Sequence, residues 1–252
     1  MKEWLPIRKS WMRGLTILFA VVFIVSGYLA FREVSARREA QKSFLELARR
    51  AQLVAPAEHE DDKPLHKHDI AALTEENDDC IGWISVSDTA VDYPVMHTPE
   101  EPQRYLRQNF SGEYSISGTP FLDGRSRAGD KNKVIFGHNM KDGSMFTGLH
   151  GYEDAAFLAE HPVIEFETSE GCTEYRVFAV LELYKDDPWY DALTLDDPGE
   201  YEKAVSEICR KALYDTGIKP AYPQELLTLS TCGGKDRDAR LAVIAVKEQP
   251  QR

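Results

Sequence analysis

The chain has 252 residues, of which 42% are hydrophobic and 29% charged, so it is long enough to bury one substantial core. Its four cysteines are widely spaced and include no CxxC pair, which excludes a dense disulfide scaffold and a structural zinc finger. The formal net charge of -12 argues against a nucleic-acid-binding protein, because phosphate binding needs a basic surface.

The charge is unevenly distributed along the chain. Residues 1–50 contain 10 Lys and Arg against 4 Asp and Glu, a balance of +6 that leaves -18 for the rest. A basic head beside an apolar run predicts attachment to an anionic membrane surface, with the acidic remainder as a separate body.

A stretch of 18 uncharged residues separates Arg13 from Arg32. As a helix it would cover about 27 Å, close to the hydrocarbon thickness of a bilayer. We therefore predict a cytoplasmic tail at 1–13 and a transmembrane helix at 14–31. A cleaved signal peptide is the alternative, because Val34-Ser35-Ala36 loosely resembles a cleavage site, although the apolar run is long for one. Either interpretation exports the rest of the chain.

Basic residues flank the apolar run on both sides, so their count does not decide the orientation. We expect the N-terminus inside the cell, because the acidic body has the character of an extracytoplasmic enzyme. The predicted location is therefore a single-pass cell-membrane protein with its main domain outside.

Residues 32–69 are predicted to form a juxtamembrane helix and a linker. Good helix formers fill 33–54 and predict an amphipathic helix, whose apolar residues among Arg and Glu are Phe44, Leu45, Leu47 and Leu53. The stretch 56–64 is polar and acidic, as linkers are. Three histidines lie in or beside it, His59, His66 and His68, and we interpret them as residues of a solvated loop rather than metal ligands.

Strand patterns dominate the predicted domain at 70–252, after a short helix near 70–76. Runs at 80–86 and 90–96 flank a polar turn and predict a hairpin. Further strands are expected at 134–136, 163–166, 175–184, 226–231 and 241–246. Short strands joined by Gly, Asp and Pro predict a mainly β barrel or sandwich.

One helix interrupts the strands. Asp197 is a suitable N-cap, with Pro198 at the first helical position and Glu200 three residues after the cap. An apolar stripe then runs through the segment, which predicts a helix at 198–215. Cys209 lies on that stripe, one turn after Val205, and is expected to pack in the core.

A cysteine and a histidine each follow a predicted strand. Cys232 ends the strand at 226–231, beside hydroxyls, glycines and charges rather than among apolar neighbours. If the next strand pairs with it antiparallel, Arg240 at the start of that strand lies near Cys232. His138 follows the strand at 134–136. A thiol and a histidine are the minimum for thiol acyl transfer, although a separation of 94 residues leaves a structural role for His138 open.

Several longer motifs extend this pattern over roughly residues 78–247. They are, in chain order, IGWISV, VDYPVM, NFSGE, FLDGR, VIFGHNMKDGSMF, HPVIEF, TLSTC and RLAVIAV. In this order they resemble the class B sortases, the membrane-anchored cysteine transpeptidases of Gram-positive bacteria. The resemblance implies a closed β-barrel of about eight strands, with N-terminal helices and one helix inserted before the cysteine strand.

The resemblance also implies roles for individual residues. Cys232 matches the nucleophile, His138 the acid/base partner and Arg240 the third catalytic residue, with Arg237 of the same loop as a rival. Ser230 and Thr231 match positions that shape the substrate groove or oxyanion site, and an ordinary role as strand residues is equally open. One departure is Phe136, where the family commonly has Tyr. No cofactor or metal is implied.

The implied reaction cleaves a C-terminal sorting signal of secreted proteins through a Cys232 thioester. The acyl group then passes to an amine of a lipid-linked cell-wall precursor or of a pilin. An alternative is an L,D-transpeptidase-like acyl transferase acting on peptidoglycan stems, although such enzymes place a Gly just before the cysteine and this chain has none. A non-enzymatic, anchored surface assembly protein is the other alternative.

Overall fold

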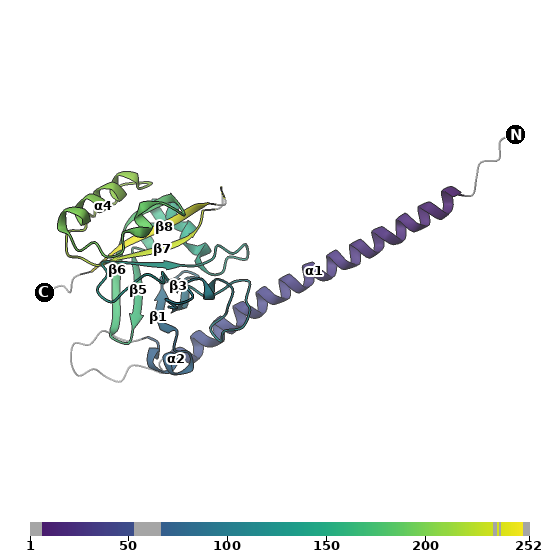
Figure 1. Ribbon diagram of the computed structural model, residues 1–252, viewed down its shortest axis with the longest axis horizontal. Helices are drawn as coiled ribbons and strands as arrows, with labels where there is room; N and C mark the ends of the chain where they lie inside the picture. Colours follow the sequence, from purple (N-terminus) through teal and green to yellow (C-terminus); the bar gives the residue numbers. More distant parts are fainter. Residues whose placement is uncertain (1–6, 53–66, 234–235, 237, 249–252) are drawn as a thin grey trace.

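The computed structural model describes residues 7–52, 67–233, 236 and 238–248. The chain begins with a 45-residue helix, α1 (Ile7–Ala51), which projects away from a compact β domain (Figure 1). Among the described residues, the part of this helix from Trp11 onward is the one segment long and apolar enough to cross a membrane. The predicted transmembrane and juxtamembrane segments thus form one continuous helix.

The last turns of α1 pack into the β domain. Phe44, Leu47, Ala48 and Ala51 are buried, whereas Leu45 on the other face is 59% exposed. The ring of Phe44 meets Tyr93 edge-on at a centroid distance of 5.5 Å. The expected apolar face is therefore confirmed at Phe44 and Leu47, and wrong at Leu45. The remaining expected position, Leu53, and the predicted linker lie outside the described residues.

Eight strands close into a single barrel, as predicted. In sheet order the neighbours are β1-β2-β3-β4-β7-β8-β6-β5. The bounds are β1 Cys80–Ser85, β2 Asp92–Met96, β3 Phe121–Leu122, β4 Asn132–Phe136, β5 Val163–Thr168, β6 Gly171–Tyr184, β7 Leu226–Cys232 and β8 Ala239–Lys247. The hairpin of β1 and β2 matches the prediction, whereas β3 was missed because two residues are too few to show a strand period.

Short helices connect the strands around this barrel. They are α2 (Ile70–Glu76), α3 (Ala155–Glu160), α4 (Pro198–Lys211) and the 3₁₀ segments η1 (Arg104–Leu106), η2 (Phe146–Glu153) and η3 (Pro188–Asp191). Helix α4 is the helix expected before the cysteine strand, and Asp197 caps it by accepting a hydrogen bond from the Glu200 N–H at 2.9 Å. It ends earlier than residue 215, because Ala212 leaves the helical conformation and the Leu213 N–H bonds to Val180 of β6.

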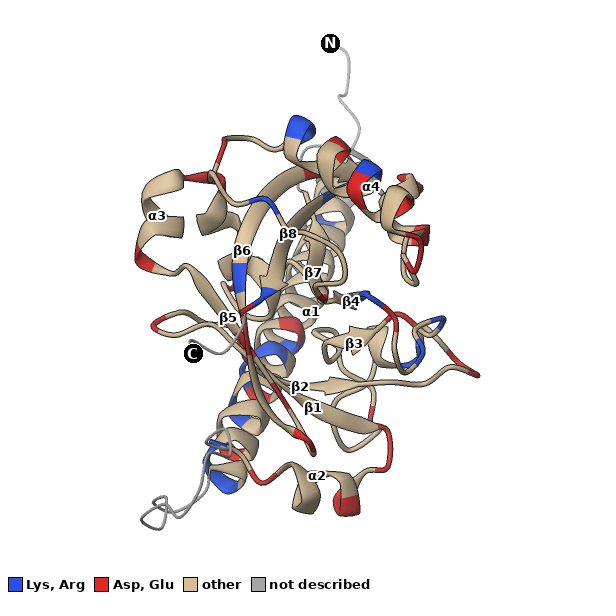
Figure 2. Ribbon diagram, turned by 90° about the vertical axis from the view of Figure 1, so that its left-hand side faces the viewer, with Lys and Arg blue, Asp and Glu red and all other residues tan. Residues whose placement is uncertain are grey.

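Charged residues are distributed unevenly over the molecule. Figure 2 shows Lys and Arg on the part of α1 that approaches the barrel, and Asp and Glu on the helices and loops around the barrel. The contrast between a basic N-terminal segment and an acidic body therefore persists in three dimensions.

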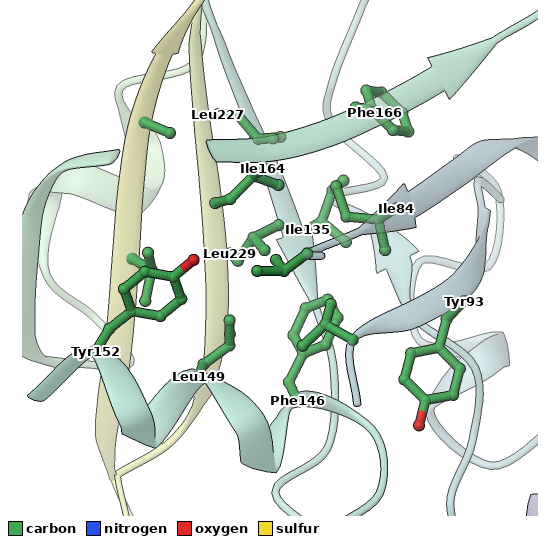
Figure 3. Close-up of a cluster of buried hydrophobic side chains, with 14 of the residues drawn as sticks. Ile84, Tyr93, Ile135, Phe146, Leu149, Tyr152, Ile164, Phe166, Leu227 and Leu229 are labelled. Atoms are coloured by element: carbon green, nitrogen blue, oxygen red, sulfur yellow. The ribbon is translucent and has the colours of Figure 1, made fainter. Parts of the chain in front are cut away.

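The barrel interior is filled by alternate side chains of its strands. Figure 3 shows Leu227 and Leu229 of β7 pointing into this core together with Ile135 and Phe146. The intervening residue Thr228 faces the other way, where Trp189 of η3 donates to its hydroxyl at 3.0 Å. Strand β7 is therefore buried on both faces, and only its last residue, Cys232, is exposed.

The interpretation of His68 as a solvated loop residue is wrong. His68 is 4% exposed, its Nδ1 lies 2.9 Å from Glu167 Oε1, and its ring stacks on Trp83 at 4.4 Å. The fully buried Glu167 needs partners for its carboxylate, and His68 and the Lys67 N–H supply them. His59 and His66 lie outside the described residues. Among the residues that are described, no cluster of His, Cys, Asp and Glu could hold a metal ion.

Candidate active site

A cavity of about 430 Å³ opens at one end of the barrel. Its walls come from the ends of β4, β7 and β8, from β3, from η1 and from the segment around η3. The five residues that the sequence singled out all line it, namely His138, Ser230, Thr231, Cys232 and Arg240. Residues far apart in the chain thus meet at one place in the fold.

Cys232 differs from the other three cysteines in its exposure. It is exposed at the end of β7, whereas Cys80 is buried and Cys172 and Cys209 are partly buried. Burial raises the pKa of the Cys80 thiol to about 11, and burial together with Glu167 and Glu165 raises that of Cys172 to about 12. Burial also raises the pKa of the Cys209 thiol. Cys232 is therefore the accessible candidate nucleophile.

Strand pairing explains why His138 lies at the same cavity as Cys232. Strands β4 and β7 run parallel, and Phe136 is opposite Ser230 in their register. Cys232 ends β7 two residues after Ser230, and His138 lies two residues beyond the end of β4, so both pairs share the same offset of 94 residues. Paired parallel strands deliver the residues at and just after their carboxyl ends to one edge of the sheet.

The imidazole of His138 is held by the loop at η1. Its Nε2 lies 2.9 Å from the Leu106 carbonyl oxygen, and because that oxygen can only accept, Nε2 carries the proton. Burial lowers the pKa of His138 below its ordinary value; the hydrogen bond to Leu106 opposes this shift and the charge of Arg107 adds to it. The tautomer leaves Nδ1 as the nitrogen that can exchange a proton.

Arg240 lies directly opposite Cys232 in the antiparallel pairing of β7 and β8. Directly opposed residues project to the same side of a sheet, so the guanidinium and the thiol share one face. Nη1 of Arg240 donates to the Ala239 carbonyl at 2.9 Å. The rival Arg237 lies outside the described residues.

The hydroxyls of Ser230 and Thr231 are both engaged within the protein. Ser230 Oγ is 2.8 Å from the Tyr190 hydroxyl, and Thr231 Oγ1 donates to the Gly137 carbonyl at 2.8 Å. Both side chains are almost completely buried. These bonds favour a role in shaping the cavity wall over direct contact with a substrate.

An aromatic surface forms part of the cavity wall. The ring of Phe136 lies 5.8 Å from both Phe121 and Tyr190. Burial raises the pKa of Tyr190 to about 12, so its hydroxyl stays protonated beside Ser230. The departure from Tyr at position 136 thus leaves an apolar wall intact.

Sequence reasoning missed three residues that touch the candidate groups. Tyr190 bonds Ser230, while Asn139 and His150 both lie close to the Cys232 carbonyl oxygen. Asn139 could have been noticed, because it directly follows His138 within the GHNM motif. Nothing in the sequence signals Tyr190 or His150, whose positions depend on the packing of η3 and η2.

Comparisons with known proteins identify relatives of this chain. A sequence model described as a sortase domain matches residues 84–248. A protein named sortase B from Listeria monocytogenes is 33% identical over 168 residues, which are 66% of this chain and 68% of the relative. Another named sortase B, from Staphylococcus aureus, is 25% identical over 241 residues, 94% of this chain and 96% of the relative. A solved structure of sortase B from B. anthracis superposes with a TM-score of 0.73 at 27% identity, covering 86% of this chain and 99% of that one.

Proposed function

The chain belongs to the sortase family, and on that premise we propose that it cleaves a C-terminal sorting signal of secreted proteins and transfers the acyl group to an amine at the cell surface. As a sortase it is a cysteine transpeptidase. The observation that carries the finer proposal is the meeting of Cys232, His138 and Arg240 at one cavity. These three side chains supply a nucleophile, a proton carrier and a fixed positive charge.

The first half of the proposed reaction forms a thioester. The Cys232 thiolate attacks the carbonyl carbon of a Thr-Gly or Thr-Asn bond, and the new C–S bond pushes an electron pair onto the oxygen. Arg240, with several N–H donors and a permanent charge, stabilises that oxyanion. His138 in its imidazolium form gives the Nδ1 proton to the departing amine as the C–N bond breaks.

The second half returns the enzyme to its starting state. The acceptor amine attacks the thioester carbonyl, and neutral His138 takes the amine proton at Nδ1. The C–S bond then breaks, Cys232 leaves as a thiolate, and a new amide joins the exported protein to the acceptor. The hydrogen bond from Nε2 to the Leu106 carbonyl keeps the ring in one orientation in both halves.

We also propose that α1 anchors the enzyme with its N-terminus inside the cell and the barrel outside. The apolar length of α1 supports the anchor, and the burial of Phe44 shows that the helix packs on the barrel. The orientation rests on the acidic character of the body. Confinement to the membrane raises the effective concentration of substrates and acceptors held in the same bilayer. A lipid-linked cell-wall precursor is therefore the acceptor that we favour over a pilin amine.

The full-length chain in detergent micelles tests this function. It is incubated with peptides carrying Thr-Gly or Thr-Asn and with a small primary amine, and products are identified by mass spectrometry. Joining of the amine to the residue that precedes the cleaved bond supports the proposal. Turnover of peptidoglycan stem peptides with no product from sorting-signal peptides would favour an L,D-transpeptidase-like activity instead.

A further inference from the structure

We propose that Asn139 is a positioning residue that ties the turn carrying His138 to the backbone of Cys232, an inference that rests on the proposed function of this site. Asn139 follows His138 directly in the chain. Its side-chain Nδ2 donates to the Cys232 carbonyl oxygen at 2.9 Å. One residue therefore connects the two candidate reacting groups, through the chain on one side and through a hydrogen bond on the other.

The Asn139 amide extends the pairing of β4 and β7 beyond its last backbone bond. That last bond runs from the Gly137 N–H to the Ser230 carbonyl at 3.0 Å. The carbonyl two residues on, that of Cys232, points to the same side of β7 because strand carbonyls alternate. The chain turns away after His138, so the side chain of Asn139 supplies the donor that a backbone N–H would otherwise supply.

Neighbouring groups fix the orientation of this amide. The Cys232 carbonyl can only accept, so the NH₂ end of Asn139 must face it. The same Nδ2 lies 2.8 Å from His150 Nε2. Asn139 Oδ1 lies 3.1 Å from the Thr147 hydroxyl, whose single proton it shares with the Met140 carbonyl oxygen at 2.7 Å.

His150 in turn is held by Glu153. An Nε2 that accepts from Asn139 is unprotonated, so it cannot also donate to the Cys232 carbonyl oxygen 3.2 Å away, and Asn139 is the donor to that oxygen. The His150 proton is then on Nδ1, which lies 2.7 Å from Glu153 Oε1. Both residues belong to η2. The chain of hydrogen bonds thus runs from η2 through Asn139 to the end of β7.

The turn that carries His138 is anchored at the same point. The Phe146 N–H donates to the His138 carbonyl at 2.9 Å, and Asn139 forms an isolated β-bridge with Met145. Because Asn139 fixes the peptide group that follows Cys232, it also fixes the direction of the Cys232 Cα–Cβ bond relative to this turn. A misplacement of about 1 Å at reacting atoms can cost about 100-fold in rate.

Two substitutions test this role in the full-length chain in detergent micelles. Asn139→Ala removes the amide, and Asn139→Asp keeps its shape but removes both donors. Gln224→Ala is the matched control, since Gln224 also bonds a backbone group through its carboxamide, accepting from the Ala221 N–H at 2.8 Å just before β7. We expect both Asn139 variants to lower kcat of peptide transfer at least about tenfold with KM within about threefold, and the control to match the wild type.

Alkylation by iodoacetamide at pH 7, mapped by mass spectrometry, gives a readout that needs no substrate. We expect Asn139→Ala to slow alkylation of Cys232 at least about fivefold, because the thiol loses its alignment with His138, while the buried Cys80 stays unreactive. The positioning role would be overturned if Cys232 were alkylated in both Asn139 variants at the wild-type rate. It would also be overturned if the fall in kcat came with faster alkylation of Cys80, which would indicate a loosened fold. Failure of the wild type to transfer any peptide would instead overturn the proposed function, and the alkylation comparison would still decide the role of Asn139.

Discussion

Cys232 and Arg240 face each other across the β7–β8 ladder, one at the end of its strand and the other near the start of the next. The register of the β7–β8 pairing, rather than the connection between the two strands, therefore sets their separation. A guanidinium placed this way can meet the negative charge that develops next to the sulfur.

Arg240→Ala should lower kcat by about 10²–10³-fold, the usual loss when one donor to an oxyanion is removed. Arg240→Lys should recover only part of this, because a point charge lacks the forked donors of Arg. Steady-state transfer kinetics measure both effects, with Arg210→Ala on the exposed face of α4 as the control. A nearly normal rate in Arg240→Ala would move the role to Arg237.

The histidine at the cavity should make stability depend on pH. Burial lowers the pKa of His138 in the folded chain below its ordinary value of about 6.5. Between these two pKa values the residue binds a proton in the unfolded chain but not in the folded chain. Stability should therefore fall as the pH drops from about 6.5 through the folded-state pKa.

His138→Gln should reduce that slope in urea unfolding measured from pH 8 to pH 4.5. It should not abolish the slope, because burial also lowers the pKa of His97. A variant whose stability declines with acid as steeply as the wild type would contradict the lowered pKa of His138.

The end of α1 should contribute to the stability of the barrel. Phe44 is 5% exposed and its neighbour Leu45 is 59% exposed, so two adjacent residues form a matched pair. Phe44→Ala should cost about 3–5 kcal/mol of unfolding free energy, as large-to-small substitutions in cores do, and Leu45→Ala less than about 0.5 kcal/mol. Equal effects of the two substitutions in urea unfolding would show that α1 does not pack on the barrel.

The buried pair of Glu167 and His68 should be a second source of stability. Burial opposes ionisation of Glu167, but hydrogen bonds from His68 and Lys67 outweigh it and keep the pKa of Glu167 below its ordinary value. The stability due to this lowered pKa is therefore present above about pH 4.3 and lost as the pH falls through the lower, folded-state value.

Glu167→Gln should cost about 3–5 kcal/mol near neutral pH, because it removes one member of a buried pair. Glu165→Gln on the same strand breaks only a half-exposed pair with Lys67 and should cost at most about 1 kcal/mol. Thermal unfolding compares the two variants, and a small loss in Glu167→Gln would mean that the pair is not formed.

The sequence predicted best those elements whose apolar and polar residues repeat regularly or whose ends carry capping residues. The strand at 226–231 and the helix beginning at Pro198 were predicted from alternation and from capping residues, and both are present. Local patterns could not reveal a two-residue strand such as β3, nor the early end of α4, which a bond to β6 determines. The burial of His68 depends on Glu167, about 100 residues away.

The candidate site shows a similar division. The proximity of Cys232 and Arg240 could be predicted from the sequence, because the two consecutive strands were expected to pair antiparallel. The proximity of His138 to Cys232 could not, since it depends on the parallel register of β4 and β7, which no local pattern encodes. Family resemblance supplied that link before the structure explained it.

The most direct test of the account is to trap the acyl-enzyme. The full-length wild-type chain is mixed with a Thr-Gly or Thr-Asn peptide without added amine, quenched in acid, digested and mapped by mass spectrometry. We predict an acyl mass on Cys232 that hydroxylamine removes and that Cys232→Ala lacks. An acyl mass on Cys80, Cys172 or Cys209, or cleavage of the peptide by Cys232→Ala, would contradict the account.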